Sequence, residues 1–234
     1  MLIMGIPNVA QTSVDEAQLA YDAGNYEAAI SLYEFVLLND NNNGAIYTNL
    51  GHAYYLNGQS GKALQNYLRA AQLLPRNAVI AEQIVLIRAE RDDEIIGQSD
   101  WVNATYTLTA DYVTISELSL SIFILWVLLF GMMSIRIKRQ GLGIPISILG
   151  IIVFIGLGLL GTRLYLDYER PSAVVLVDDV QVMSGPDTSY LELFTLHEGM
   201  ELRIVENRED WVRFALPDGR QGWVMSDHIG LIAS

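Results

Sequence analysis

The chain has 234 residues, 51% of them hydrophobic, a formal net charge of −13 and no cysteine. The lack of cysteine excludes disulfides, thiolate catalysis and zinc–thiolate sites. Because the chain is strongly acidic, nucleic acid and anionic membrane surfaces are poor partners. The composition therefore favours protein or peptide partners over nucleic acid.

Residues 1–12 (MLIMGIPNVAQT) lack the basic start of a secretory signal peptide, and their apolar part is short. Asn8-Val9-Ala10 before Gln11 is typical of the small-residue end of such a peptide. We interpret residues 1–12 as the remnant of a signal peptide. The alternative is that the first apolar span inserts and carries a short N-terminal domain across the membrane.

Residues 13–96 contain an internal repeat, because Gly24, Ala29 and Tyr33 recur 34 residues later as Gly58, Ala63 and Tyr67. A 34-residue period of paired helices is the tetratricopeptide spacing. The second copy resembles that family at these positions: Tyr47, Leu50-Gly51, Tyr54, Ala63, Tyr67, Ala70 and Pro75. The resemblance implies an all-α domain in which Gly51 and Ala63 are small where two helices cross closely.

The resemblance also implies a concave face lined by the first helix of each repeat, which in this family usually receives a peptide. A clamp for C-terminal carboxylates needs cations on that face, but Val14, Gln18, Val79 and Gln83 stand there instead. We predict peptide contacts by Tyr21, Asn49, His52 and Tyr55. The alternative, weighted equally, is that these side chains face solvent or the next helix.

A polar and aromatic linker, residues 97–117, precedes two long apolar runs at 118–135 and 144–166. As helices they reach about 27 and 34 Å, against a hydrocarbon core of about 30 Å. Between them, residues 136–143 carry Arg136, Lys138 and Arg139 and no acid. The pattern predicts a transmembrane helical hairpin with a basic loop.

Short loops rich in Lys and Arg stay in the cytoplasm, so Arg136, Lys138 and Arg139 orient the hairpin. Both flanking domains are then on the other side. We predict a multi-pass protein of the bacterial inner membrane with both terminal domains on the periplasmic or extracellular side.

One side of the second run gathers small residues: Gly143, Ser147, Gly150, Gly158 and Gly161. Small residues allow close backbone approach inside membranes. We interpret this side as packing against the first run, in preference to a dimerisation seam.

Residues 171–234 change to alternating and β-branched patterns, with turns at Ser184–Asp187, Glu198-Gly199 and Pro217–Gly219. Strands are predicted at 174–177, 179–183, 201–205, 211–214 and 222–225, which indicates a small all-β barrel. The segments VQVMSGPDT (180–188), LHEG (196–199), WVRF (211–214) and DGRQGWV (218–224) resemble the bacterial SH3 (SH3b) family.

The sequence shows no catalytic pattern. His52, His197 and His228 have no metal-ligand spacing, and no Ser-His-Asp order or phosphate-binding loop occurs. We predict that the protein is not an enzyme and needs no cofactor or metal.

The predicted fold is therefore multidomain: tetratricopeptide helices, a two-helix transmembrane hairpin and an SH3-like barrel. This order resembles the BatE-type membrane proteins of bacterial aerotolerance operons. That resemblance implies a membrane-anchored scaffold beside von Willebrand factor A-type membrane proteins and a MoxR-type AAA+ ATPase. The alternative function is a cell-wall sensor whose SH3b domain binds peptidoglycan peptides, with an aromatic and acidic cleft near Trp211 and Trp223.

Overall fold

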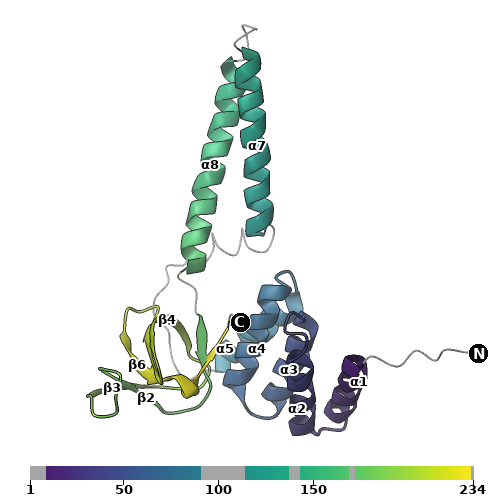
Figure 1. The fold of residues 1–234 in the computed structure, drawn as a ribbon, viewed down its shortest axis with the longest axis vertical. Helices are drawn as coiled ribbons and strands as arrows, with labels where there is room; N and C mark the ends of the chain where they lie inside the picture. Colours follow the sequence, from purple (N-terminus) through teal and green to yellow (C-terminus); the bar gives the residue numbers. More distant parts are fainter. Residues whose placement is uncertain (1–8, 91–113, 137–142, 169–171, 233–234) are drawn as a thin grey trace, which may run out of the picture. The chain divides into compact units, whose positions relative to one another are not determined.

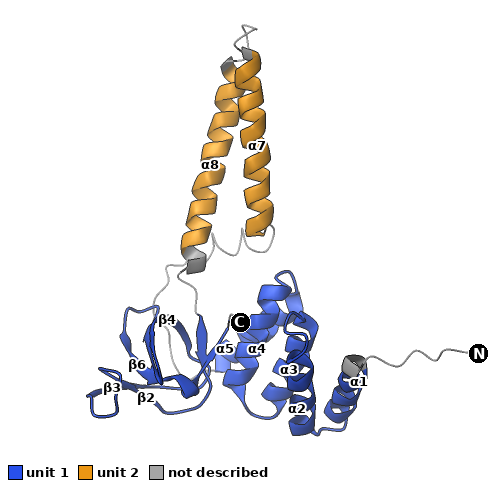
Figure 2. Cartoon of the chain, in the orientation of Figure 1, with its two compact units in different colours: residues 1–98, 171–234 blue, residues 99–170 orange. Residues whose placement is uncertain are grey.

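A computed structural model of the chain describes residues 9–90, 114–136, 143–168 and 172–232 (Figure 1). The described residues divide into two compact units, one formed by residues 1–98 and 171–234 and the other by residues 99–170 (Figure 2). The first unit contains five α-helices and all the β-strands of the described part, and the second contains two helices.

The five helices of the first unit form two helical hairpins followed by a further helix. Their bounds are α1 (Val9–Asp22), α2 (Tyr26–Leu37), α3 (Gly44–Leu56), α4 (Ser60–Leu73) and α5 (Ala78–Glu90). The two hairpins turn in the same way, because Gly24 and Gly58 both have a φ of 76°. Glycine adopts this left-handed conformation without steric cost, so it ends α1 and α3 at equivalent points of the 34-residue period.

Helices α3 and α4 cross closely where the sequence analysis expects them to. A Cβ on Gly51 would lie 3.2 Å from the Tyr67 ring and 3.3 Å from the Ala63 carbonyl oxygen. Ala63 and Tyr67 are fully buried. The small residues at this crossing therefore bring the two backbones together, as predicted, whereas assignment to the tetratricopeptide family stays a prediction.

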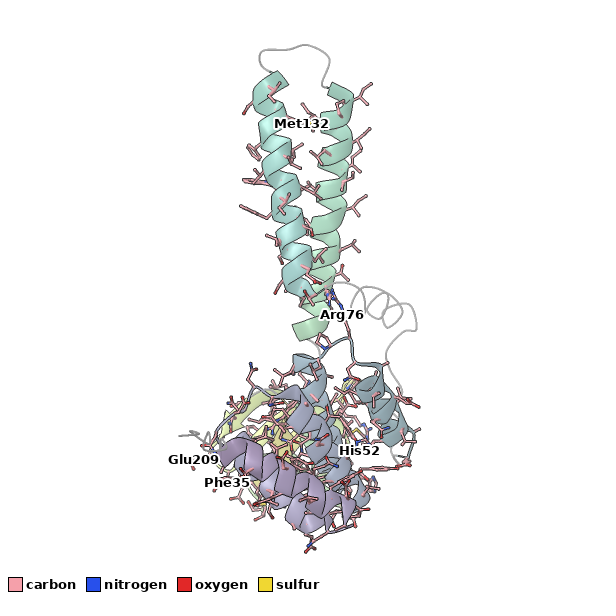
Figure 3. The ribbon with its side chains drawn as sticks, turned by 90° about the vertical axis from the view of Figure 1, so that its right-hand side faces the viewer. Phe35, His52, Arg76, Met132 and Glu209 are labelled. Carbon is pink, nitrogen blue, oxygen red and sulfur yellow. The ribbon has the colours of Figure 1, made fainter. Side chains whose placement is uncertain are left out.

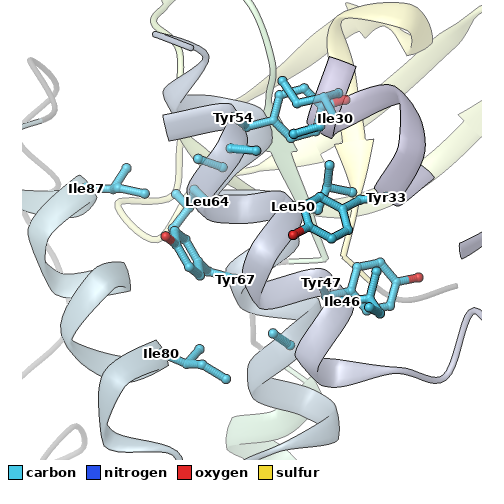
Figure 4. Close-up of a cluster of buried hydrophobic side chains, with 14 of the residues drawn as sticks. Ile30, Tyr33, Ile46, Tyr47, Leu50, Tyr54, Leu64, Tyr67, Ile80 and Ile87 are labelled. Carbon is cyan, nitrogen blue, oxygen red and sulfur yellow. The ribbon is translucent and has the colours of Figure 1, made fainter. Parts of the chain in front are cut away.

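Large aromatic and branched side chains fill the space between the helices (Figure 4). Tyr33 and Tyr67, one from each hairpin, are both fully buried. Ile80 and Ile87 of α5 complete this core from the far side of α4, as the labelled side chains in Figure 4 show. Burial of side chains of this size contributes about 1.5–3 kcal/mol each, so the repeat helices are held mainly by this core.

The C-terminal part of the first unit is an antiparallel sheet in the order β3-β2-β6-β5-β4-β1-β7. The strands are β1 (Ala173–Val175), β2 (Val180–Met183), β3 (Glu192–Leu196), β4 (Glu201–Arg208), β5 (Trp211–Ala215), β6 (Gln221–Met225) and β7 (Ile229–Leu231). Its core is formed by inward side chains such as Val182, Leu202, Phe214 and Val224. This arrangement is consistent with the SH3-like barrel predicted from the sequence.

The predicted strand set was incomplete. Strands β3 and β7 were not predicted, and β4 is longer than expected. β3 has one β-branched residue, Thr195, and pairs with β2 through an irregular register at Val182 and Met183. β7 has three residues and is held by its pairing with β1. Both strands thus depend on tertiary pairing more than on their own sequence pattern.

The helices and the barrel share one core. Val174 of β1 and Ile232, after β7, are buried in the hydrophobic cluster of the helices. The hydrogen bonds that join the two parts are described below. The sequence analysis treated residues 13–96 and 171–234 as separate domains and left open whether they touch. In the structure they pack together.

The second unit consists of α7 (Ile115–Arg136) and α8 (Gly143–Tyr168), which pack against each other. Thr114 and Glu117 cap α7 reciprocally: the Thr114 amide donates to the Glu117 carboxylate at 2.8 Å, and the Glu117 amide donates to Thr114 Oγ1 at 3.2 Å. Pro145 lies in the first turn of α8, where its missing N–H leaves no hydrogen bond unmade.

Both helices are long and apolar enough to cross a membrane, over Ile115–Ile135 and Ile144–Tyr165. Few residues of either segment are buried in the structure, and their side chains, Met132 among them, surround the helix pair (Figure 3). A core helix of a soluble protein would be covered by protein on most sides. The exposed apolar surface therefore agrees with the predicted pair of membrane spans.

The small-residue interpretation of α8 was wrong for three of the glycines. A Cβ added at Gly150, Gly158 or Gly161 would meet nothing within 4 Å. The glycine that α7 approaches is Gly156, where a Cβ would lie 3.1 Å from Cγ1 of Ile122. The side of α8 that faces α7 is thus offset from the side that carries most of the small residues.

Several sequence boundaries fall at the edges of the described residues. Residues 1–8 of the predicted signal-peptide remnant lie outside them, and the rest of that segment begins α1. Most of the linker, 97–113, also lies outside them, as do Lys138 and Arg139 of the basic loop. Arg136 ends α7.

Candidate functional site

The predicted peptide-binding residues of the helices lie on α1 and α3. His52 packs edge-on against the ring of Tyr67, with 5.8 Å between ring centroids. Burial lowers the pKa of His52, so its imidazole is neutral at pH 7 and can donate one hydrogen bond and accept another. Tyr21 packs edge-on against Tyr26, with 5.7 Å between ring centroids.

Hydrogen bonds connect these residues to neighbouring helices. Tyr55 on α3 donates through its hydroxyl to the Glu90 carboxylate on α5 at 2.9 Å. This hydrogen bond raises the pKa of the Tyr55 phenol, because it favours the protonated form. Tyr33, on α2, donates to Gln18 Oε1 on α1 at 3.2 Å. Burial raises the pKa of Tyr33, and a hydrogen bond with Asn49 offsets part of this rise. Of the predicted residues, Asn49 and Tyr55 on α3 are thus hydrogen-bonded to α2 and α5.

Tyr67 on α4 contacts the predicted residue His52, although the sequence analysis assigned Tyr67 no binding role. Its hydroxyl is buried and makes no hydrogen bond among the described residues. Burial raises its pKa, and the phenols of Tyr21 and Tyr55 add to the rise. Tyr67 therefore lies beneath the predicted binding residues from α1 and α3. The 34-residue period, which aligns Tyr67 with Tyr33, is the signal that could have identified it.

This face offers phenol, amide and imidazole groups together with one carboxylate, Glu90. Such groups bind peptide amides and hydroxyls by hydrogen bonds and by aromatic packing. Whether Tyr21, Asn49, His52 and Tyr55 bind a peptide stays a prediction.

The predicted barrel residues, Trp211 and Trp223, lie on neighbouring strands and on the sheet face opposite the barrel core. Arg213 pairs with Trp223 across β5 and β6, and Arg208 pairs with Trp211 across β4 and β5. Trp211 is half-buried, but Trp223 is only 7% exposed. The guanidinium of Arg208 lies 5.3 Å from the centroid of the Trp223 ring and covers it.

Glu206 connects the two arginines of this face. Its carboxylate accepts a hydrogen bond from Arg208 Nε at 2.6 Å and lies 3.7 Å from Arg213 Nη1. The surroundings of Trp223 are therefore a mixed cluster of two cations and one acid, where the sequence analysis expected an aromatic and acidic cleft. Trp223 is thus largely covered, with Arg208 over its ring, whereas part of Trp211 is accessible.

No group of three or more His, Asp or Glu side chains within the described residues is arranged to hold a metal ion. His197 lies 4.0 Å from Asp179, and His228 lies 3.7 Å from Asp227, each a single pair at the barrel surface.

Comparison with known proteins agrees with the barrel assignment. The family model of the bacterial SH3 domain matches residues 177–229, which include β2 to β6. Domains of this family commonly bind proteins or peptidoglycan. No curated protein matches the chain.

Proposed function

We propose that the protein is a membrane-anchored scaffold that holds a helical binding face and a bacterial SH3 domain on the outer side of the bacterial inner membrane. One observation carries the proposal: residues 1–98 and 171–234 fold into one unit, although two candidate spans separate them in the chain. Two segments that pack together must lie on the same side of a membrane. The intervening chain therefore crosses the membrane an even number of times, as a hairpin of α7 and α8 does.

The charge of the loop between the two spans indicates how the hairpin is oriented in the membrane. Arg136, Lys138 and Arg139 lie between the spans, and short loops with such an excess of cations stay in the cytoplasm. The packed unit is then outside the cytoplasm, where a bacterial SH3 domain is also expected. Partners of the BatE-type resemblance, the von Willebrand factor A-type membrane proteins, would meet the unit at this surface.

Reporter fusions test the topology. Alkaline phosphatase and a fluorescent protein are each inserted into the full chain after Asp100 or Gln140, or fused after Ser234, so that both spans are present in every variant. The proposal predicts phosphatase activity after Asp100 and Ser234 and fluorescence after Gln140 alone. Phosphatase activity at only one of the two ends would contradict it, because a packed unit cannot be divided by the membrane.

A second function, binding of cell-wall peptides, is favoured by the bacterial SH3 match and by the accessible Trp211. Purified sacculi are mixed with the detergent-solubilised full chain and with its Trp211→Ala variant, and the bound protein is measured after sedimentation. A wall sensor binds sacculi and loses binding in the variant. A scaffold that binds only proteins leaves both variants in the supernatant.

The proposal assigns no reaction and no cofactor to the protein. Two hydroxyls of the helical face have partners on neighbouring helices: Tyr55 donates to Glu90, and Tyr33 donates to Gln18. Their arrangement supports recognition of a partner segment. A nucleophile aligned with a general base, which hydrolysis requires, would have a different geometry.

A further inference from the structure

A stripe of three α4 residues faces the barrel: Gly61, Gln65 and Arg69. The Gly61 amide donates a hydrogen bond to Glu198 Oε1 at 2.7 Å. Gln65 Nε2 and Arg69 Nη2 each donate to the carbonyl oxygen of Leu231 at 2.8 Å. We call Gly61, Gln65 and Arg69 the α4 stripe. Its hydrogen bonds reach two separate segments of the barrel, the turn before β4 and the end of β7.

Helix α5 adds an ion pair in which the helix again supplies the donor and the barrel the acceptor. Arg88 donates from Nε and Nη2 to the two carboxylate oxygens of Glu201, at 2.7 and 2.8 Å. Glu201 is only 5% exposed, so this two-point ion pair is partly shielded from water. In all these contacts the helices supply the donors and the barrel supplies the acceptors. The two surfaces are therefore chemically complementary in one orientation.

Two glycines permit the close approach of the surfaces. A Cβ on Gly61 would lie 2.4 Å from the carbonyl oxygen of Val175, and a Cβ on Gly230 would lie 2.5 Å from Gln65 Cδ. Real Cβ atoms do not approach other heavy atoms this closely. The interface thus requires glycine at position 61, where a Cβ would meet backbone, whereas at Gly230 a Cβ would displace the end of the Gln65 side chain.

The first repeat provides an internal comparison. The 34-residue period places Glu27, Ser31 and Phe35 of α2 at the positions of the α4 stripe. All three are exposed, and Phe35 is 48% exposed (Figure 3). A glutamate in place of Gly61 would repel the barrel sterically and through Glu198. The features that receive the barrel are therefore present in the second repeat and absent from the first.

We propose that the α4 stripe and Arg88 form a dedicated docking surface for the chain's own SH3 barrel, and that docking makes helices and barrel one cooperative folding unit. The helical face around Tyr67 and the barrel face around Trp211 then belong to one rigid body. A partner that contacts both faces binds without an entropic cost for arranging them. This inference concerns the unit alone and holds whichever side of the membrane the unit occupies.

Engineered cysteines test the docking, since the chain has none of its own. The Gln65→Cys/Gly230→Cys variant of the full chain is purified in detergent, oxidised, and then cleaved by protease between the two segments. Docking brings these side chains within disulfide range, so the two fragments stay linked until a reductant is added. In the control variant, Gln65→Cys/Leu191→Cys, the second cysteine lies on the exposed segment before β3, and the fragments separate.

Equal linkage in both variants, or separation in both, would overturn the proposal.

A charge exchange gives a second measurement that does not depend on cysteine. Urea unfolding of the helices, followed by circular dichroism, and of the barrel, followed by the fluorescence of Trp211 and Trp223 in a Trp101→Phe/Trp126→Phe background, should coincide. Arg88→Glu should separate the two transitions, and Arg88→Glu/Glu201→Arg should bring them together again. Separate transitions in the background chain would show two independent domains and refute the inference.

Discussion

Replacement of Arg88 by methionine tests the contribution of the charged contact between the helices and the barrel. Methionine keeps most of the apolar stem of Arg88, so the change removes mainly the two hydrogen bonds to Glu201. Glu201 has a side chain only 6% exposed and would lose the guanidinium that compensates its burial.

The magnitude follows from the burial of each partner. Removal of one partner from a fully buried ion pair costs about 3–5 kcal/mol. The Arg88 side chain is 42% exposed, and water therefore screens part of the interaction. We expect Arg88→Met to lower the free energy of unfolding of the first unit by about 2 kcal/mol.

The assay is urea unfolding of the full chain in detergent micelles, followed by circular dichroism. Arg220→Met is the matched control, because Arg220 pairs with Asp218 within one exposed turn at 2.7 Å. Exposed pairs of this kind contribute about 0–1 kcal/mol, so the control should change little. Equal effects of the two substitutions would refute the assignment of Arg88–Glu201 as the stronger pair.

Three further predictions concern the same unit. Burial raises the pKa of Glu198 above its ordinary value of 4.5, so its protonated form is favoured in the folded state. The free energy of unfolding should fall as pH rises from below 4.5 through the folded pKa, and Glu198→Gln should flatten this slope in urea unfolding measured along a pH series. An unchanged slope would contradict this cause. Gly61→Ala puts a Cβ 2.4 Å from a backbone oxygen and should lower the free energy of unfolding by about 1–3 kcal/mol. An unchanged urea midpoint would show that the barrel does not contact α4 closely at this position. Tyr67→Phe removes a buried hydroxyl without a partner among the described residues, so it should raise the free energy of unfolding by about 1 kcal/mol and raise the thermal midpoint with it. A lower midpoint would indicate a hydrogen bond to bound water.

Local patterns in the sequence were sufficient for the helices and for most of the barrel. The 34-residue recurrence of Gly24 and Gly58 predicted both hairpin turns, because glycine adopts a positive φ without steric cost. Likewise, an uninterrupted apolar run predicts a span through its length alone. Such features depend on near neighbours in the chain.

The contact between helices and barrel could not be predicted in this way. Gly61, Gln65 and Arg69 have no meaning as a docking surface until Glu198 and Leu231, more than 130 residues later in the chain, are placed opposite them. A signal is visible in retrospect, because the α4 stripe departs from its equivalents on α2. The difference between repeats identified the positions with a specific role.

The burial of Trp223 also could not be predicted from the sequence. Tryptophan on a barrel strand is compatible with a ligand-binding surface and with a covered one, and the choice depends on Arg208 from another strand. Tyr55 was predicted as a peptide contact, and in the structure its hydroxyl bonds to Glu90. Its neighbour Glu90 lies one helix away, yet no local pattern links the two.

The account depends most on the claim that both ends of the chain are on the outer side of the membrane. A membrane-impermeant maleimide applied to bacterial spheroplasts measures this directly in three single-cysteine variants: Leu19→Cys on α1, Lys138→Cys and Leu191→Cys before β3. Leu19 and Leu191 are 68% and 72% exposed, so a cysteine at either position is accessible to the reagent. The account predicts labelling at positions 19 and 191 in intact spheroplasts, and at 138 only after lysis. Labelling of position 138 in intact spheroplasts, or of only one of the other two, would contradict it.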